Sequence, residues 1–78
     1  MAVAAYVLIQ AETGRAFQVA EAVRASDGVI SADTVAGPYD VIVKAQAPSL
    51  DELGRLVLSN IQTVEGIIRT FTCPIFEL

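Results

Sequence analysis

The residues in this sequence best suited to bind a small molecule are Gly37, Pro38, Tyr39 and Asp40, in the stretch GPYD. Runs rich in β-forming residues flank this stretch, which predicts a turn between two strands. Exposed loop amides can bind a carboxylate, and one fixed aspartate can pair with an ammonium group. A plain hairpin turn fits equally well, since Pro38 pre-sets the backbone, Gly37 permits a positive φ, and Asp40 can accept hydrogen bonds from neighbouring amides. The residues alone leave both interpretations open.

The composition excludes several kinds of chemistry. The 78 residues include no histidine and one cysteine, so the chain has neither a Cys-His dyad nor a thiolate-imidazole metal site, and no internal disulfide. Most acidic residues fall on predicted helix surfaces or at element ends, so no acid-base pair is expected in an enclosed site. Five basic residues against nine acidic ones give no cationic stripe that could meet phosphates. We expect no catalytic residue, no metal, no cofactor and no direct binding of nucleic acid.

The apolar content is high for so short a chain. A domain of this length buries only about 60% of its unfolded surface, yet 54% of the residues are hydrophobic. Such a chain tends to bury the excess apolar surface against another subunit, so we expect self-association. The longest apolar run, residues 2–9, is too short to span a bilayer and no basic segment precedes it, so a cytoplasmic protein without membrane contact is expected. Cys73 is expected to be a buried strand residue.

The sequence contains an internal repeat. YVLIQA (residues 6–11) parallels DVIVKA (residues 40–45), 34 positions later (6 to 40). DGVI (residues 27–30) parallels EGII (residues 65–68), 38 positions later (27 to 65). The four extra residues fall where a helix is expected, so the second helix should be about one turn longer than the first. Two copies of a strand-helix-strand unit are predicted.

The periodicity within each unit agrees with this assignment. Apolar residues recur at helical spacing, as Ala16, Val19, Ala20 and Val23 in the first unit and as Leu50, Leu53, Val57, Ile61 and Val64 in the second. Ser49 can cap the second helix, with Glu52 three residues on as in a capping box. Gly28 and Gly66 follow the helical patterns as stop signals. The predicted strands are residues 4–10, 29–36, 41–47 and 67–73.

The order β-α-β-β-α-β predicts an α+β, ferredoxin-like fold, with a four-stranded antiparallel sheet and both helices on one face. Strands 4–10 and 41–47 should be central, and Pro74 should end the last strand or sit at a bulge. The first strand is apolar on both sides, with Ala5, Val7 and Ile9 on one and Tyr6 and Leu8 on the other. Two helices cover only one face. The other face, to which Phe71 or Thr70 and Thr72 contribute, needs a second sheet, most simply that of another copy, and we expect dimerisation through the sheets.

From the turn to the last strand, the sequence VAGPYDVIVKAQAPSLDELGRLVLSNIQTVEGIIRTFTCPIF resembles the effector-binding (RAM) domain of Lrp/AsnC-type regulators. That family typically has Gly-x-x-Asp at this turn, then an amphipathic helix, Gly-Val or a near equivalent, and a Thr-x-Thr strand. Here they correspond to Gly37 and Asp40, to Gly66 with Ile67, and to Thr70 with Thr72. The family's regulators carry an N-terminal helix-turn-helix, whereas this sequence begins directly at the first strand. The resemblance therefore implies a stand-alone RAM-like domain over residues 1–78, without a DNA-binding domain.

In the family, the same loop borders an effector pocket that also receives residues from an adjacent dimer, and free amino acids are the usual ligands. The resemblance implies ligand binding by Val35, Ala36, Gly37, Pro38, Tyr39, Asp40, Thr70 and Thr72. The resemblance also implies the partners of the chain. These are a free amino acid or similar small effector, further copies of the chain in a homodimer that assembles into an octamer-like ring, and full-length Lrp/AsnC regulators. The expected role is that of a binding and oligomerisation module linked to transcriptional regulation through partners, not that of an enzyme.

Two other classes share the predicted fold. Small ferredoxin-like dimers include enzymes of the monooxygenase and isomerase type, but the missing histidine and acid-base pair argue against that class. ACT-type regulatory domains bind ligand at a glycine in the first β-α turn, where this chain has Gly14. A ligand located at Gly14 rather than at Gly37 would favour the ACT-type interpretation.

Overall fold

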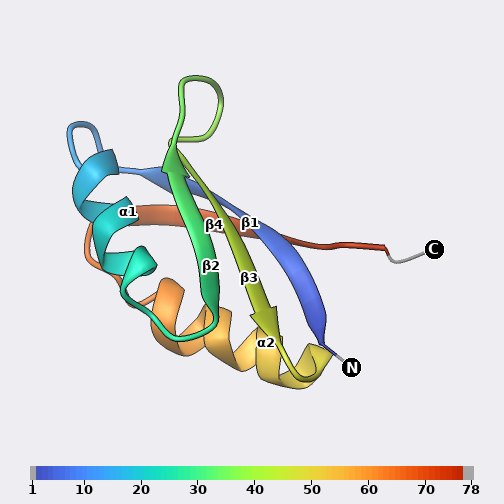
Figure 1. The fold of residues 1–78 in the computed structure, drawn as a ribbon. Helices are drawn as coiled ribbons and strands as arrows, with labels where there is room; N and C mark the ends of the chain where they lie inside the picture. The colour runs from blue at the N-terminus through green and yellow to red at the C-terminus, as the bar shows by residue number, and fades with distance from the viewer. Residues whose placement is uncertain (1, 77–78) are drawn as a thin grey trace.

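The computed structural model describes residues 2–76 and contains the predicted order of elements (Figure 1). A π-helical turn, η1 (Val57–Ile61), continues α2 (Leu50–Leu56), so the second helical segment has 12 residues (7 and 5) against 9 in α1 (Ala16–Arg24), as the repeat predicted. Residues 77–78, at the C-terminus, lie outside the described residues. The elements are β1 (Val3–Ala11), α1 (Ala16–Arg24), β2 (Val29–Thr34), β3 (Val41–Ala47), α2 (Leu50–Leu56), η1 (Val57–Ile61) and β4 (Ile67–Pro74).

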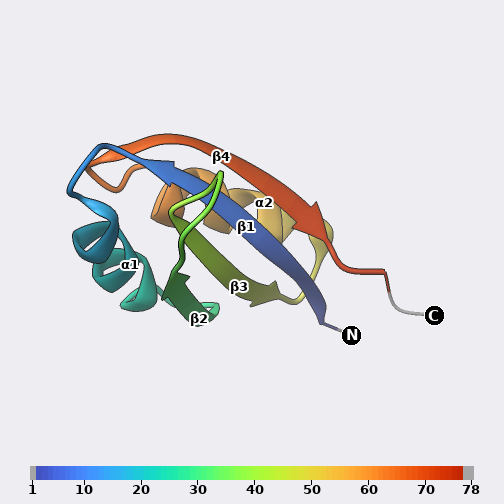
Figure 2. The same ribbon diagram turned by 90° about the horizontal axis from the view of Figure 1, so that it is seen from above.

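The four strands form one antiparallel sheet in the order β2-β3-β1-β4. β1 and β3 are therefore the central strands, as predicted, and β4 ends at Pro74. Both helices lie on the same side of the sheet, because the buried side chains of α1 and of the second helical segment belong to one core cluster with alternate residues of the strands. In Figure 2 the strands pass in front of α2. The prediction of a ferredoxin-like α+β fold is confirmed.

The core lies between the sheet and the helices. Alternate residues of the central strands are fully buried on that side, and the helices supply the opposing side chains. Because no polar or charged side chain among the described residues is buried there, burial of apolar surface dominates the stability of this layer. The largest buried side chains are Val7, Ile9, Val19, Val23, Val41, Val43, Leu53 and Ile61.

The opposite side of the sheet, here called the open face, carries Tyr6, Leu8 and Gln10 of β1 and the residues in register with them on β3 and β4. Phe71 lies opposite Leu8 and belongs to this face, which settles the alternative that the sequence left open. The side chains of Tyr6 and Phe71 are 43% and 45% exposed. None of the helices within residues 2–76 covers this face, so these apolar side chains face outward in the single chain.

The prediction that Cys73 is buried was wrong. Cys73 lies in β4 as expected, but it is opposite Tyr6 on the open face and is exposed. The sequence predicted that β4 lies at an edge of the sheet, but not that its odd-numbered residues, from Arg69 on, point away from the helices.

Local signals at the helix ends agree with the prediction. The Ser49 side chain accepts a hydrogen bond from the backbone nitrogen of Glu52 at 3.2 Å, so it caps α2. Gly28 follows α1 with a φ of +86° and accepts, through its carbonyl oxygen, a hydrogen bond of 2.8 Å from the Gln46 nitrogen. This bond joins the start of β2 to the end of β3.

We predict that Gly28→Ala lowers the free energy of unfolding by about 2 kcal/mol or more, because a side chain is strained at positive φ and adds atoms to a packed site. The new Cβ would overlap Leu56 Cδ1 and lie 3.0 Å from the Gln46 carbonyl oxygen. The matched control is Gly54→Ala in α2, where a Cβ meets nothing within 4 Å. This change should raise stability by about 0.5–1 kcal/mol. Urea denaturation at one protein concentration measures both, and equal stability of Gly28→Ala and wild type would contradict the argument.

Candidate functional site

The loop of residues 35–40 extends beyond the end of the sheet, where β2 joins β3 (Figure 1, green). The Val35 nitrogen donates to the Asp40 carbonyl oxygen at 2.9 Å, which closes the loop at its base. β2 therefore ends at Thr34 rather than at residue 36, and Val35 and Ala36 belong to the loop. Gly37 has a φ of +146°, and a Cβ there would meet nothing within 4 Å. Glycine is needed at this position for backbone conformation, not for space.

Asp40 fastens the loop to the central strand β1. Its carboxylate Oδ2 accepts a hydrogen bond of 2.8 Å from the Ala11 nitrogen, and its own backbone nitrogen donates to the Ile9 carbonyl oxygen at 2.9 Å. Ala11 is the last residue of β1, next to a break in the pairing of β1 with β4. The carboxylate satisfies a partly buried amide at this break, and a hydrogen bond with a charged acceptor is stronger than one between neutral groups. Asp40 is thus held in one position.

Two further contacts hold the loop against the open face. The Gln10 amide nitrogen Nε2 donates to the Pro38 carbonyl oxygen at 3.1 Å. The Tyr39 ring meets the Phe71 ring edge to face, with 5.8 Å between the ring centres and 73° between the planes. Tyr39 and Asp40 are half-buried, whereas the four preceding residues are exposed. The tip of the loop is therefore accessible while its base is fixed.

The structure brings together the six predicted site residues of the loop, but it does not bring Thr70 and Thr72 to them. These two lie opposite Ile9 and Val7, whose side chains are buried beneath the helices, so both threonines face the helix side of the sheet. Thr70 Oγ1 accepts a hydrogen bond of 2.9 Å from Gln62 Nε2, at the end of the π-helical turn. Within one chain, the predicted residues form two separate groups.

Sequence reasoning missed Gln10 and Phe71 as neighbours of the loop. Both are on the open face, on β1 and β4, and they reach the loop only because the strands pair in this register. No local motif marks them. An alternating strand pattern combined with the strand order could have found Gln10, since it is the open-face residue of β1 nearest the β2-β3 turn. On β4 that position is Arg69, and Phe71 lies two residues further along the strand.

The loop offers hydrogen-bonding and apolar groups rather than a metal site. Within residues 2–76 no three His, Cys, Asp or Glu side chains cluster as a metal ion requires. The second carboxylate oxygen of Asp40, Oδ1, accepts no hydrogen bond from the described residues. None of the helices within the same range is long and apolar enough to cross a membrane.

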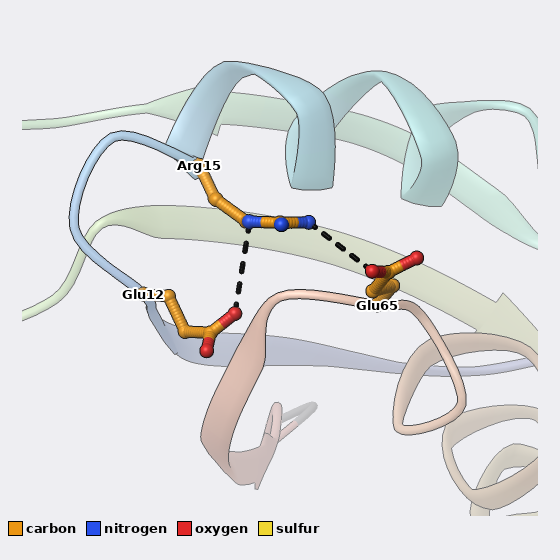
Figure 3. Close-up of polar contacts among 3 residues, drawn as sticks. All are labelled: Glu12, Arg15 and Glu65. Atoms are coloured by element: carbon orange, nitrogen blue, oxygen red, sulfur yellow. Dashed lines mark hydrogen bonds and ion pairs between the residues drawn. The ribbon is translucent and has the colours of Figure 1, made fainter.

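The first β-α turn, where an ACT-type domain would bind its ligand, is tied to the start of β4 (Figure 3). Arg15 lies between two carboxylates, with Nε 3.7 Å from Glu12 and Nη1 3.4 Å from Glu65. The Glu12 nitrogen donates to the Gly66 carbonyl oxygen at 2.8 Å. Gly14 has a φ of +82° with open space beside it. These contacts join β1, α1 and β4, so the turn has a structural role.

Comparison with known proteins gives consistent relationships. The family model of the Lrp/AsnC ligand binding domain matches residues 4–77. The chain is similar to an uncharacterized HTH-type transcriptional regulator of Pyrococcus abyssi, with 32% identity over 60 residues, which are 77% of this chain and 40% of that protein. The chain spans less than half the length of the curated relatives that it matches.

Two solved structures are also similar to the chain. The protein TTHA0845 from Thermus thermophilus superposes with a TM-score of 0.90 and 30% identity, covering 97% of this chain and 95% of that one. The transcriptional regulator NMB0573 of Neisseria meningitidis, solved as its L-Met complex, superposes with a TM-score of 0.83 and 17% identity, covering 96% of this chain and 50% of that one. The second likeness concerns the fold alone.

We predict that Asp40→Ala lowers the free energy of unfolding by about 1–3 kcal/mol, because the partly buried Ala11 amide loses its acceptor. The control is Glu21→Ala, which removes an exposed carboxylate from α1 and should change stability by no more than about 0.5 kcal/mol. Both are measured by urea denaturation without ligand at one protein concentration. If the two variants are equally stable, Asp40 does not anchor the loop.

Proposed function

The chain belongs to the Lrp/AsnC ligand-binding domain family, and on that premise we propose that it binds a free amino acid at the 35–40 loop and assembles with further copies of itself. The observation that carries the proposal is the fixed carboxylate of Asp40. One oxygen is held by the Ala11 amide, so the other has a defined position beside an exposed loop. A preorganised carboxylate can pair with an α-ammonium group without losing side-chain entropy on binding.

The opposite end of the ligand needs donors. Free backbone N–H groups at the tip of the loop can bind a carboxylate, and the exposed residues Ala36 and Gly37 can supply them. Thr70 and Thr72 are the other expected contacts, and they face a different side of the sheet from Tyr39 within one chain. Their participation requires a second copy that presents its β4 to the loop of the first. The likeness to a regulator solved with L-Met supports an amino acid as the ligand class.

Assembly through the open face is the second part of the proposal. Tyr6, Leu8 and Phe71 give this face a group of apolar side chains that none of the helices within residues 2–76 covers. Packing of two such sheets about 10 Å apart would bury these side chains in both copies. A further contact between dimers, leading to an octamer-like ring, fits the exposure of Leu50 and Leu58 on the outer side of the second helical segment, at 60% and 62%.

The regulatory role is proposed from the family and the curated relatives, which are transcriptional regulators. A RAM-like domain of this kind would act on transcription through partners, most directly through full-length Lrp/AsnC regulators that share this fold. Binding and assembly are the whole of the proposed activity, and no catalytic step is included. The cytoplasm is the proposed location, since that is where such partners meet DNA.

We predict that a thermal-shift screen of the free amino acids identifies a ligand. At 100 times its dissociation constant, the ligand should add about 2.7 kcal/mol to the stability of the native state. The N-acetylated form of the same amino acid lacks the ammonium group and should give no shift. A flat response to every amino acid would remove ligand binding and leave assembly as the remaining role.

The variant Asp40→Asn then tests the site. The Asn oxygen can accept from the Ala11 amide, which turns the NH₂ group toward the position of Oδ1 and places a donor against the ligand ammonium. We expect the fold to persist and affinity to fall by about 1.5–3 kcal/mol, the range for a lost charged hydrogen bond. Calorimetric titration of both proteins at matched oligomeric state measures this, and equal affinity would exclude Asp40 from the site.

For the assembly, we predict a light-scattering mass of at least two chains at micromolar concentration. Phe71→Glu places a charge among the apolar side chains of the open face and should shift the mass toward one chain, because an unpaired charge is costly to bury. Gln18→Glu, on the exposed side of α1, is the matched control and should leave the mass unchanged. A wild-type mass of one chain would refute dimerisation through the sheets.

A further inference from the structure

A hollow of about 510 Å³ lies at the end of the sheet opposite the 35–40 loop. It is formed by Ala2, the start of β2 with its preceding glycine (residues 28–30), and the end of β3 with the following proline (residues 46–48). Gln46 belongs to the open face, because its neighbours Ala45 and Ala47 are buried beneath the helices. The hollow therefore opens at a corner of the open face, beside the edge strand β2. Most of its surface is apolar, which suits an apolar side chain.

The most exposed large apolar side chain among the described residues is Phe76, at 92%. It follows β4, and the preceding residue, Ile75, donates its backbone nitrogen to the Ala4 carbonyl oxygen at 2.9 Å. This bond directs the C-terminal segment past the start of β1, away from the body of the molecule (Figure 2). Antiparallel pairing places the end of β4 at the same end of the sheet as the start of β2. The exposed phenyl ring and the hollow thus lie at the same end of the sheet, at opposite edges.

Two-fold symmetry brings this ring and this hollow together in only one of two arrangements. Consider two sheets packed by their open faces. A two-fold axis parallel to the strands and midway between the sheets places each outer strand of one copy over the other outer strand of the second copy. Corresponding ends of the two sheets then lie at the same end of the dimer. β4 of one copy then lies over β2 of the other, with Phe76 beside the second copy's hollow. An axis perpendicular to the strands instead places β4 over β4, with the two C-terminal segments at opposite ends. We infer that the dimer uses the parallel axis and that Phe76 of each copy fills the hollow at Ile30 of the other.

Burial of apolar surface favours this contact twice per dimer. An aromatic side chain buries about 150–250 Å², and the hollow is large enough to hold a phenyl ring. Ile30, which is 55% exposed at the break in the β2-β3 pairing, would be covered by the same ring. The inference rests on the sheet-to-sheet dimer proposed above. It adds a partner residue to each edge of that interface and fixes the direction of the symmetry axis.

The test is a disulfide cross-link. The variant Ile30→Cys/Phe76→Cys is made in a Cys73→Ser background, because Cys73 is a free, exposed thiol. Mild oxidation should convert most of the protein to a covalent dimer on a non-reducing gel. The control Phe17→Cys/Phe76→Cys pairs the same position with a residue of α1 that is 77% exposed on the helix side of the sheet. This control should remain mostly monomeric, as should Phe76→Cys alone.

A second measurement uses uncrosslinked protein. Phe76→Ala should weaken the dimer at least about tenfold, as expected for the loss of a buried aromatic side chain at both edges, whereas Phe76→Leu should retain most of the affinity. Sedimentation equilibrium gives both dissociation constants. Dimers that form normally in Phe76→Ala, or that do not cross-link at 30 and 76, would overturn the tail contact while leaving the sheet dimer intact. A cross-link within one chain would show that the segment folds onto its own hollow, and a monomeric wild type would refute the dimer itself.

Discussion

The structure depends on one imbalance: a sheet with two apolar faces has helices on only one of them. β1 occupies the centre of the sheet, and its alternate residues are apolar on both sides. On the helix side this produces a dry core without any buried polar side chain among the described residues. On the open side it leaves aromatic rings half-exposed. A chain of this size gains little stability from one thin core, so covering the second face in the proposed dimer would provide a large share of the available apolar burial.

The fold was predictable because its signals are local or repeated. The internal repeat predicted two equivalent units, and short-range motifs such as Ser49 with Glu52 marked the helix start. The difference in helix length also followed from the repeat, since the four extra residues had no other place in the pattern. That the additional turn is π-helical could not be seen, because a π turn differs from an α turn only in which carbonyl the next amide reaches, here the Val57 oxygen for the Gln62 nitrogen.

The site was only partly predictable because it depends on register and on distant pairs. Asp40 meets an amide 29 positions earlier, at Ala11, which no spacing rule reveals. In β4 the pairing with β1 shifts between Gln10 and Ala11, so one extra residue, Ile68, lies in that strand. Such a shift moves every following side chain to the other face. It decides that Phe71 joins the open face and that the neighbouring threonines do not, a distinction that alternation in the sequence cannot make.

The same register links the candidate ligand loop to the open face. Tyr39 belongs to the loop and packs on Phe71, which lies in the apolar centre that a second copy would cover. A ligand that orders Tyr39 therefore also acts on a residue of the proposed interface, and burial of Phe71 in a dimer would fix one wall of the loop. Binding and assembly through a shared contact are thermodynamically reciprocal, so each would strengthen or weaken the other by the same factor. Asp40 contributes the rigid side of this arrangement, because its bond to β1 holds the base of the loop.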